Sequence, residues 1–229
     1  MNSVSKKNET PKLESLADIN QKTKQAYNKA ADKYQQLFFD ELDKKEFDKN
    51  YLDEFSKHFK SNSIICDAGC GPCGHIAKYL TDKGMNVIGI DISEKCIEIA
   101  KKNFPTIPFE VGDFCKLNFS DNYFDGIISY YSVLDTPKIY LDKVMNEFHR
   151  VLKIGGYLLL VVKEGAAEGF QSDLLGIETE IYFSLFTKKE IECFLKSNNF
   201  KIIKIEQRNP YADEINIERI FSISKKIIQ

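Results

Sequence analysis

Short, almost continuously apolar segments alternate with segments of helical periodicity along most of this chain. The runs NVIGI (86–90) and YLLLVV (157–162) contain almost no polar residue, which is typical of strands that helices cover on both faces. The segment 187–199, opened by a Thr187–Glu190 capping box, is one of the helices between such runs. This alternation predicts an α/β fold with a doubly wound, mostly parallel sheet and helices on both faces.

We expect seven strands in this sheet. They fall at residues 63–66, 86–90, 108–111, 124–130, 157–163, 201–207 and 215–226. Only the short segment RNPYADE joins the last two, and it is too short for a parallel crossover. The sheet is therefore expected to close with an antiparallel C-terminal hairpin strand.

Two amphipathic helices are predicted ahead of the first strand, in an N-terminal helical cap over residues 17–60. The first carries Tyr27 and Tyr34 at helical spacing in one apolar stripe. Residues 1–16 are polar and include a proline, so we expect a disordered or mobile tail there. The α/β domain would occupy residues 61–229.

Charge and hydropathy restrict the possible partners. The 229 residues carry a net charge of -2, and without an excess of Lys and Arg a dedicated nucleic-acid binder is not expected. The longest purely apolar run, 157–162, is far too short to span a membrane. The N-terminal residues lack the apolar core of a secretory signal. We therefore predict a cytoplasmic protein without membrane contact, as a monomer or homodimer, whose six cysteines are thiols.

The segment CDAGCGPCGH (66–75) has two interpretations. Cys70 and Cys73 frame the Cys-Gly-Pro-Cys sequence of thioredoxin dithiols, which would need a helix N-terminus to lower a thiol pKa. Alternatively, Gly69 and Gly71 follow the first strand and let the backbone approach a ligand closely. The chain is about twice the size expected of a thioredoxin, and a dithiol site has no use for the preceding Asp-Ala-Gly turn. Both facts favour the second interpretation.

Two carboxylates at the ends of the next strands support the ligand interpretation. Asp91 ends the second strand, where a carboxylate can accept both ribose hydroxyls of an adenosine. Asp113 follows the third strand, in position to bond an adenine amino group. Because open α/β sheets bind ligands outside the carboxyl ends of their strands, the three loops predict one nucleoside-containing ligand.

These motifs resemble the class I S-adenosylmethionine-dependent methyltransferases, small-molecule type. IICDAGCGPCG (64–74) looks like the first motif of the family. GIDIS (89–93) looks like its ribose-binding loop, and VGDF (111–114) looks like its adenine-binding loop. FDGIISYYSVLDTP (124–137) resembles the motif of the fourth strand. KQAYNKAADKYQQLF (24–38) resembles a helix that closes over the cofactor. The third glycine of the family motif falls at Cys73, so this loop departs from the pattern.

The resemblance implies S-adenosyl-L-methionine as cofactor, an N-terminal helical lid and methyl transfer to a small-molecule acceptor. It implies cofactor contacts from Asp67, Gly69, Cys70, Gly71, Asp91, Ile92, Asp113, Phe114, Ser129, Tyr130, Tyr27 and Tyr34. Three alternatives stay open: an NAD(P)-dependent dehydrogenase, a non-catalytic, cofactor-binding interaction protein, and a methyltransferase that acts on a protein. No metal is expected, because Cys66, Cys70 and Cys73 lack a fourth ligand.

No catalytic residue follows from the pattern, and Asp135 is the one candidate. It would act as a base or orient the acceptor, or else cap a helix predicted over residues 137–153.

The acceptor site is sought in the insertion 163–186, since long loops are often functional. Its aromatic residues would wall a pocket together with Tyr131; they are Phe170, Tyr182, Phe183 and Phe186. Two of the three arginines, Arg208 and Arg219, are candidates for binding an acceptor carboxylate.

Overall fold

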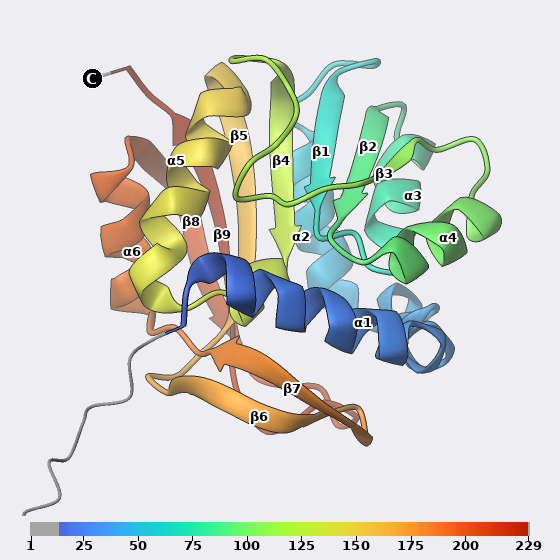
Figure 1. Ribbon diagram of the computed structural model, residues 1–229. Helices are drawn as coiled ribbons and strands as arrows, with labels where there is room; N and C mark the ends of the chain where they lie inside the picture. Colours follow the sequence, from blue (N-terminus) through green and yellow to red (C-terminus); the bar gives the residue numbers. More distant parts are fainter. Residues whose placement is uncertain (1–13, 229) are drawn as a thin grey trace, which may run out of the picture.

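The computed structural model describes residues 14–228. Most of the expected mobile tail, residues 1–13, lies outside that range, and the first helix already begins at Leu16. At the centre is a seven-stranded sheet of order β3-β2-β1-β4-β5-β9-β8 (Figure 1). Its strands are β1 (Ile64–Ala68), β2 (Asn86–Asp91), β3 (Phe109–Val111), β4 (Phe124–Tyr130), β5 (Leu152–Lys163), β8 (Phe200–Arg208) and β9 (Arg219–Lys226).

Strand β9 is antiparallel to both of its neighbours, and the pairs among β1 to β5 are parallel. This arrangement confirms the predicted mostly parallel sheet with its antiparallel C-terminal strand. The carboxyl ends of β1 to β4 consequently meet at one edge of the sheet, which is the edge where ligands bind in such folds.

Helices cover both faces of the sheet, as predicted. They are α2 (Glu46–Ser56), α3 (His75–Asp82), α4 (Glu94–Asn103), α5 (Leu141–Val151) and α6 (Lys188–Ser197). Neighbouring residues of a strand enter different cores: Ile127 packs with α5 and α6, whereas Ile128 packs with α2, α3 and α4. This alternation follows from the two-residue period of a strand, and it explains why nearly every strand position is apolar.

Helix α1 (Leu16–Phe38) lies across the carboxyl edge of the sheet (Figure 1). The Ser15 side chain caps it by accepting from the Asp18 amide. Its Ala31 packs against Cys96 and Ile99 of α4, and a 3₁₀ turn, η1 (Glu41–Lys44), leads from it to α2. The N-terminal helix therefore occupies the position at which a lid was expected.

The insertion between β5 and α6 forms a hairpin instead of a long loop. Strands β6 (Glu168–Leu174) and β7 (Ile177–Ser184) pair antiparallel and lie beneath α1 (Figure 1). Leu175 and Gly176 at its turn have φ of 57° and 76°, which is the two-residue geometry that suits a right-twisted hairpin. The hairpin adds a second wall at the carboxyl edge of the sheet.

The segment before β5 differs from the prediction. Residues 138–140 form a separate 3₁₀ turn, η3 (Lys138–Tyr140), and α5 ends at Val151 because Leu152 already pairs with Phe124 of β4. Pairing then jumps to Gly126 with Tyr157, so the glycines at 155 and 156 fall within an irregular strand. Within residues 14–228, no helix combines the length and the apolar character needed to cross a membrane.

Candidate functional site

A pocket, here called the first pocket, lies between α1 and the carboxyl ends of β1 to β4. Nine of the twelve predicted cofactor residues line it: Tyr27, Tyr34, Gly69, Gly71, Asp91, Ile92, Asp113, Phe114 and Tyr130. The candidate base Asp135 lines it as well. Five further residues line it, Asn20, Thr23, Tyr131, Ser132 and Thr136; of these only Tyr131 was predicted, and as part of the acceptor site.

The glycine loop turns sharply at the end of β1. Gly69 and Gly71 have φ of 81° and 61°, which side chains disfavour. A Cβ on Gly69 would lie 2.2 Å from the Ser132 Cβ, whereas a Cβ on Gly71 would have no atom within 4 Å. Gly69 is thus required for packing against the turn after β4, and Gly71 leaves an open backbone face beside the first pocket.

Asp91 joins the glycine loop to the end of β2. Its Oδ2 accepts the Gly71 amide at 2.9 Å, and its Oδ1 accepts the Ser93 amide at 2.9 Å. Burial raises the pKa of Asp91 to about 6, against the lowering effect of these amides. Each carboxylate oxygen keeps a free lone pair, so Asp91 can still accept hydroxyl groups from the pocket.

Asp113 joins the loop after β3 to α1. Its Oδ1 accepts the Cys115 amide at 2.7 Å, and its Oδ2 accepts the Asn20 side-chain amide at 2.8 Å. No sequence pattern pointed to Asn20, because an asparagine on the polar face of a helix has no pattern of its own. This bond ties the helix over the first pocket to the predicted adenine loop.

A small side cavity adjoins the first pocket, sharing Tyr34, Gly69, Gly71 and Tyr130 with it. Two predicted residues, Asp67 and Cys70, line this side cavity instead of the first pocket, as do His75 and Glu41.

Acidic groups dominate the side cavity. Asp67 Oδ2 is buried without a hydrogen-bond partner, and burial together with the nearby charge of Asp91 raises the pKa of Asp67 to about 7. Glu41 Oε1 lies 3.0 Å from His75 Nε2. Burial alone would raise the pKa of Glu41, but His75 and Lys45 lower it overall. Such a cavity suits an ammonium group and is unfavourable for a diphosphate.

Ser129 is the predicted residue that lines none of these spaces. It is fully buried, and its hydroxyl lies 2.7 Å from that of Ser132, which also bonds the Ala68 carbonyl. Ser132 therefore stands between Ser129 and the first pocket, and the expected contact of Ser129 with a cofactor is not supported. The neighbouring Tyr130 lines the pocket with its ring, while its hydroxyl donates to Asp48.

The geometry gives no support to dithiol chemistry at Cys70 and Cys73. Both are free thiols, both are buried, and burial raises the pKa of both above the ordinary value. The thiolate is the reactive form, and these sites disfavour it. Among residues 14–228, no group of three His, Cys, Asp or Glu side chains is arranged to hold a metal ion.

Asp135 ends a 3₁₀ turn, η2 (Ser132–Asp135), that follows β4. No side chain caps η3 or α5, so the interpretation of Asp135 as a helix cap is wrong. Burial raises the pKa of Asp135 to about 7, with Tyr27 and Lys163 opposing the rise. A carboxyl group with such a pKa can take up a proton near neutral pH.

A second cavity of about 450 Å³ opens next to the first pocket. Four residues line both spaces: Tyr27, Tyr34, Tyr131 and Asp135. Tyr131 has a φ of 65°, a conformation that bulky residues rarely adopt and that is often found at functional sites. The two spaces therefore meet at the turn that follows β4.

Only part of the predicted acceptor wall lines the second cavity. Tyr131 and Phe183 do so, but Phe186 is fully buried in the core beside α5 and α6. Phe170 and Tyr182 pack on each other, with ring centroids 5.0 Å apart, and line neither space. Hairpin formation explains this outcome, because cross-strand pairing of Phe170 with Tyr182 turns both rings to the same face.

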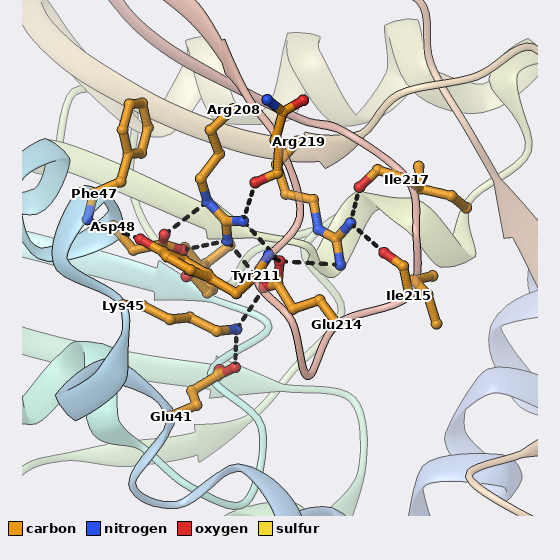
Figure 2. Close-up of polar contacts among 12 residues, drawn as sticks. Glu41, Lys45, Phe47, Asp48, Arg208, Tyr211, Glu214, Ile215, Ile217 and Arg219 are labelled. Carbon is orange, nitrogen blue, oxygen red and sulfur yellow. Dashed lines mark hydrogen bonds and ion pairs between the residues drawn. The ribbon is translucent and has the colours of Figure 1, made fainter.

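Both candidate arginines are engaged within the protein (Figure 2). Arg208 Nε lies 2.9 Å from Asp48 Oδ2, and its Nη1 lies 2.7 Å from Glu214 Oε2. Arg219 donates to the carbonyls of Ile215 and Ile217. The expectation that Arg208 binds an acceptor is therefore wrong, and Arg219 is left with only its Nε unpaired.

Comparisons with known proteins agree with this geometry. Residues 66–160 match the methyltransferase domain family. The chain is 27% identical over 167 residues to phosphoethanolamine N-methyltransferase 2 of Caenorhabditis elegans, covering 70% of this chain and 37% of that protein. It is 31% identical over 109 residues to demethylmenaquinone methyltransferase of Symbiobacterium thermophilum, covering 43% of this chain and 42% of that protein. The chain thus spans about two fifths of these relatives' length.

Solved structures extend the similarity to nearly the whole chain. The crystal structure of Burkholderia thailandensis 1,6-didemethyltoxoflavin-N1-methyltransferase, with bound 1,6-didemethyltoxoflavin and S-adenosylhomocysteine, superposes with a TM-score of 0.71. The two proteins are 13% identical, and the match covers 96% of this chain and 93% of the other. Residues 66–160 thus resemble a methyltransferase domain, and the whole chain has the fold of this S-adenosylhomocysteine-bound methyltransferase.

Proposed function

We propose that this chain is an S-adenosylmethionine-dependent methyltransferase that acts on a small-molecule acceptor. One observation carries the proposal: the glycine loop, Asp91 and Asp113, from the ends of three neighbouring strands, line a single pocket. That pocket adjoins a second cavity with room for a further small molecule.

The residues present fit S-adenosylmethionine. Asp91 would hold the ribose hydroxyls, and Asp113 with Phe114 would frame the adenine. The unpartnered Asp67 Oδ2 in the side cavity supports a nearby ammonium group, and the open face of Gly71 leaves room for the chain of the ligand. When bound, this cofactor supplies a methyl group already activated on a sulfonium.

The remaining work of the protein is alignment and proton transfer. Tyr27, Tyr34 and Tyr131 line both spaces, so their rings would bound the path between the two ligands and exclude water from it. Holding two reactants in line can lower a barrier by roughly 7–11 kcal/mol. Asp135 at the junction would accept a proton from an acceptor that is protonated at neutral pH.

The side cavity separates this proposal from an NAD(P)-dependent dehydrogenase. A dinucleotide would place its diphosphate at the glycine loop and the N-terminus of α3. Here Asp67 and Glu41 border that place, and Pro72 removes one amide donor from the loop. Both features oppose a diphosphate.

Calorimetric titration with S-adenosylhomocysteine and, separately, NADH tests the proposal. We expect S-adenosylhomocysteine to bind, NADH to give no signal, and Asp91→Ala to weaken binding at least ~10-fold because charged hydrogen bonds to the ribose are lost. Asp82→Ala, an exposed change on α3, is the matched control. NADH binding in place of S-adenosylhomocysteine contradicts the proposal.

A methyl-transfer screen against small acids, phenols and amines follows the titration. Cofactor binding without transfer to any acceptor would favour the alternative of a non-catalytic interaction protein. A cytoplasmic location, a monomeric or homodimeric state, and the absence of nucleic-acid partners stay predictions, as does the division into residues 17–60 and 61–229.

A further inference from the structure

The second cavity has a mainly apolar wall. Its apolar side chains come from η2, the β6–β7 hairpin and the segment before β9, and they include Leu134, Leu174, Leu175, Phe183, Ile215 and Ile217. The space of about 450 Å³ is limited in volume and bounded by these side chains. It therefore suits a small, largely apolar molecule better than a segment of a protein or nucleic-acid chain.

Most charged groups in this wall neutralise one another (Figure 2). Lys45 Nζ lies 2.5 Å from Glu41 Oε2 and 3.0 Å from Glu214 Oε1. Glu214 also pairs with Arg208 and, at 3.4 Å, with Arg219. Glu41 has His75 as a further partner. Of these residues, Glu41, Lys45, Glu214 and Arg219 line the cavity, and Arg208 and His75 help to compensate their charges from behind the wall.

Several hydrogen-bond donors around the cavity lack a partner within residues 14–228, and three of them belong to Lys163, Tyr131 and Arg219. Lys163 Nζ makes no ion pair or hydrogen bond, and burial together with the adjacent Arg219 lowers the pKa of Lys163. The Tyr131 hydroxyl and Arg219 Nε are buried without partners. Lys163 and Arg219 face each other in the β5–β9 register, so two cations stand side by side. Glu214 lies 3.4 Å from the Arg219 guanidinium, and the charges of Asp135 and Glu214 act on Lys163 without a hydrogen bond or ion pair to it.

Unpaired buried donors beside two neighbouring cations call for an anionic oxygen. On this basis, and resting on the proposed function, we propose that the methyl acceptor is a small aromatic or aliphatic acid. Its carboxylate or phenolate oxygen binds the Lys163 ammonium and the Tyr131 hydroxyl, and its apolar part fills the second cavity.

The opposing candidate is a cationic amine held by Asp135. Asp135 lines both spaces, but burial disfavours its charged form, and Lys163 lies close enough to act on its pKa. An ammonium ligand in the second cavity would therefore stand near Lys163 and Arg219 and would leave the three donors unpaired. The wall accordingly favours the acid over the amine.

Three probes with one ring system separate these possibilities: 2-naphthoate, 2-naphthol and 2-naphthylmethylamine. Each is titrated into the protein with S-adenosylhomocysteine and, in parallel, without it. We expect the tighter-binding of the two acids, naphthoate or naphthol, to bind at least ~10-fold more strongly than the amine. Only the acids offer an oxygen that can accept hydrogen bonds from the unpaired donors. Comparison of naphthoate with naphthol shows whether a carboxylate or a phenol is the preferred source of the oxygen.

Variants of Lys163 identify the residue responsible. Lys163→Met should weaken binding of the preferred acid at least ~10-fold and leave the amine unweakened, whereas Lys163→Arg, which keeps the charge, should largely restore acid binding. Lys189→Met, an exposed lysine on α6, is the matched control and should change nothing. Unchanged S-adenosylhomocysteine affinity in each variant shows that the first pocket is intact.

Three results overturn the inference: amine binding as strong as that of both acids, acid binding that Lys163→Met does not alter, or binding of neither acid. Failure of S-adenosylhomocysteine to bind would instead contradict the proposed function, and the titrations without it still test the acid site by themselves.

Discussion

The glycine loop, Asp91 and Asp113 of the first pocket come from the ends of three strands that follow one another in the chain, whereas the wall of the second cavity joins segments far apart. Gly71 and Asp91, which bond each other, are 20 positions apart. Asp48 and Arg208, which anchor the wall of the second cavity, are 160 positions apart. Local backbone geometry shapes the first pocket, and buried ion pairs hold together the wall of the second.

The difference has an energetic consequence. Backbone amides that satisfy a carboxylate cannot be removed by mutation of one side chain, so single side-chain changes in the first pocket should affect ligand binding more than folding stability, except at its glycines. A buried ion pair is sensitive to either partner, because the survivor is left as an uncompensated charge. The two regions should therefore respond differently to single substitutions.

Asp48→Ala should produce the largest loss of stability. Asp48 is fully buried between Arg208 and the Tyr130 hydroxyl, and its removal should lower the free energy of unfolding by about 4 kcal/mol. The control Asp82→Ala breaks only an exposed pair with Lys78 and should cost about 0.5 kcal/mol. Urea unfolding measures both.

S-adenosylhomocysteine affinity of folded Asp48→Ala should fall much less than stability. The ring of Tyr130 stays packed between Tyr131 and Phe221, with centroids at 4.6 and 6.5 Å. A stability loss below about 1 kcal/mol would show that the buried pair is dispensable, and the comparison between the two regions would fail.

Gly69→Ala and Gly71→Ala form the next test, directed at the first pocket. Both place a side chain at positive φ, which costs about 1–2 kcal/mol. Gly69→Ala should lose about 3 kcal/mol in total, because its Cβ collides with Ser132. Gly71→Ala should remain the more stable variant, yet lose S-adenosylhomocysteine affinity because its methyl group enters the ligand face. Equal stability of the two would contradict the assigned geometry.

Residues of the first pocket were predictable because each belongs to a short pattern at a strand end. Gly69, Gly71, Asp91 and Asp113 each follow an apolar strand, and parallel strands bring their carboxyl ends together without further information. Ser129, for which a cofactor contact was expected, does not line the first pocket. Alternation along a strand does not reveal which hydroxyl a neighbouring turn will cover. Here Ser132 covers it.

The second cavity was less predictable for physical reasons. Leu175 adopts a left-handed conformation at the β6–β7 turn, where asparagine or glycine would have signalled a hairpin. Strand β6 of that hairpin is polar and largely exposed, so it lacks the apolar pattern of a core strand. Pairing of Asp48 with Arg208 depends on the finished tertiary structure, and no local pattern contains it.

Asp67→Asn should stabilise the protein without ligand. The pKa of Asp67 is raised from 3.8 to about 7 in the fold, so the folded state binds its proton more tightly, and wild-type stability falls as pH rises from 3.8 to 7. Asparagine does not titrate. Its advantage should therefore grow over that range and reach about 2 kcal/mol at pH 8, less than the full shift because its amide also lacks a partner.

Unfolding at pH 5 and pH 8 measures this gain, and titration with S-adenosylhomocysteine measures its functional cost. Affinity should fall, since the ammonium group of the ligand loses its charged partner. If the variant is no more stable than wild type at pH 8, the buried, ionised Asp67 carboxylate does not destabilise the folded protein. The side cavity would then lose its role in selecting a cation.

Asn20→Ala should have the smallest effect on stability, about 1 kcal/mol, because one hydrogen bond to Asp113 is lost. These residues are 93 positions apart, so here the first pocket depends on a distant segment, as the second cavity does throughout. Loss of the bond should loosen α1 and speed dissociation of S-adenosylhomocysteine about fivefold, which stopped-flow displacement can measure.

Lys24→Ala is the control for Asn20→Ala. Lys24 is also on α1 and pairs with Glu94 of α4, but it does not line the first pocket. If both variants release the ligand equally fast, the rate of release depends on how firmly α1 is attached to the domain as a whole, and not on the bond to Asp113. If Asn20→Ala releases it more slowly than wild type, Asn20 competes with the ligand for the Asp113 carboxylate. Only faster release confined to Asn20→Ala shows that a remote side chain completes an otherwise local pocket.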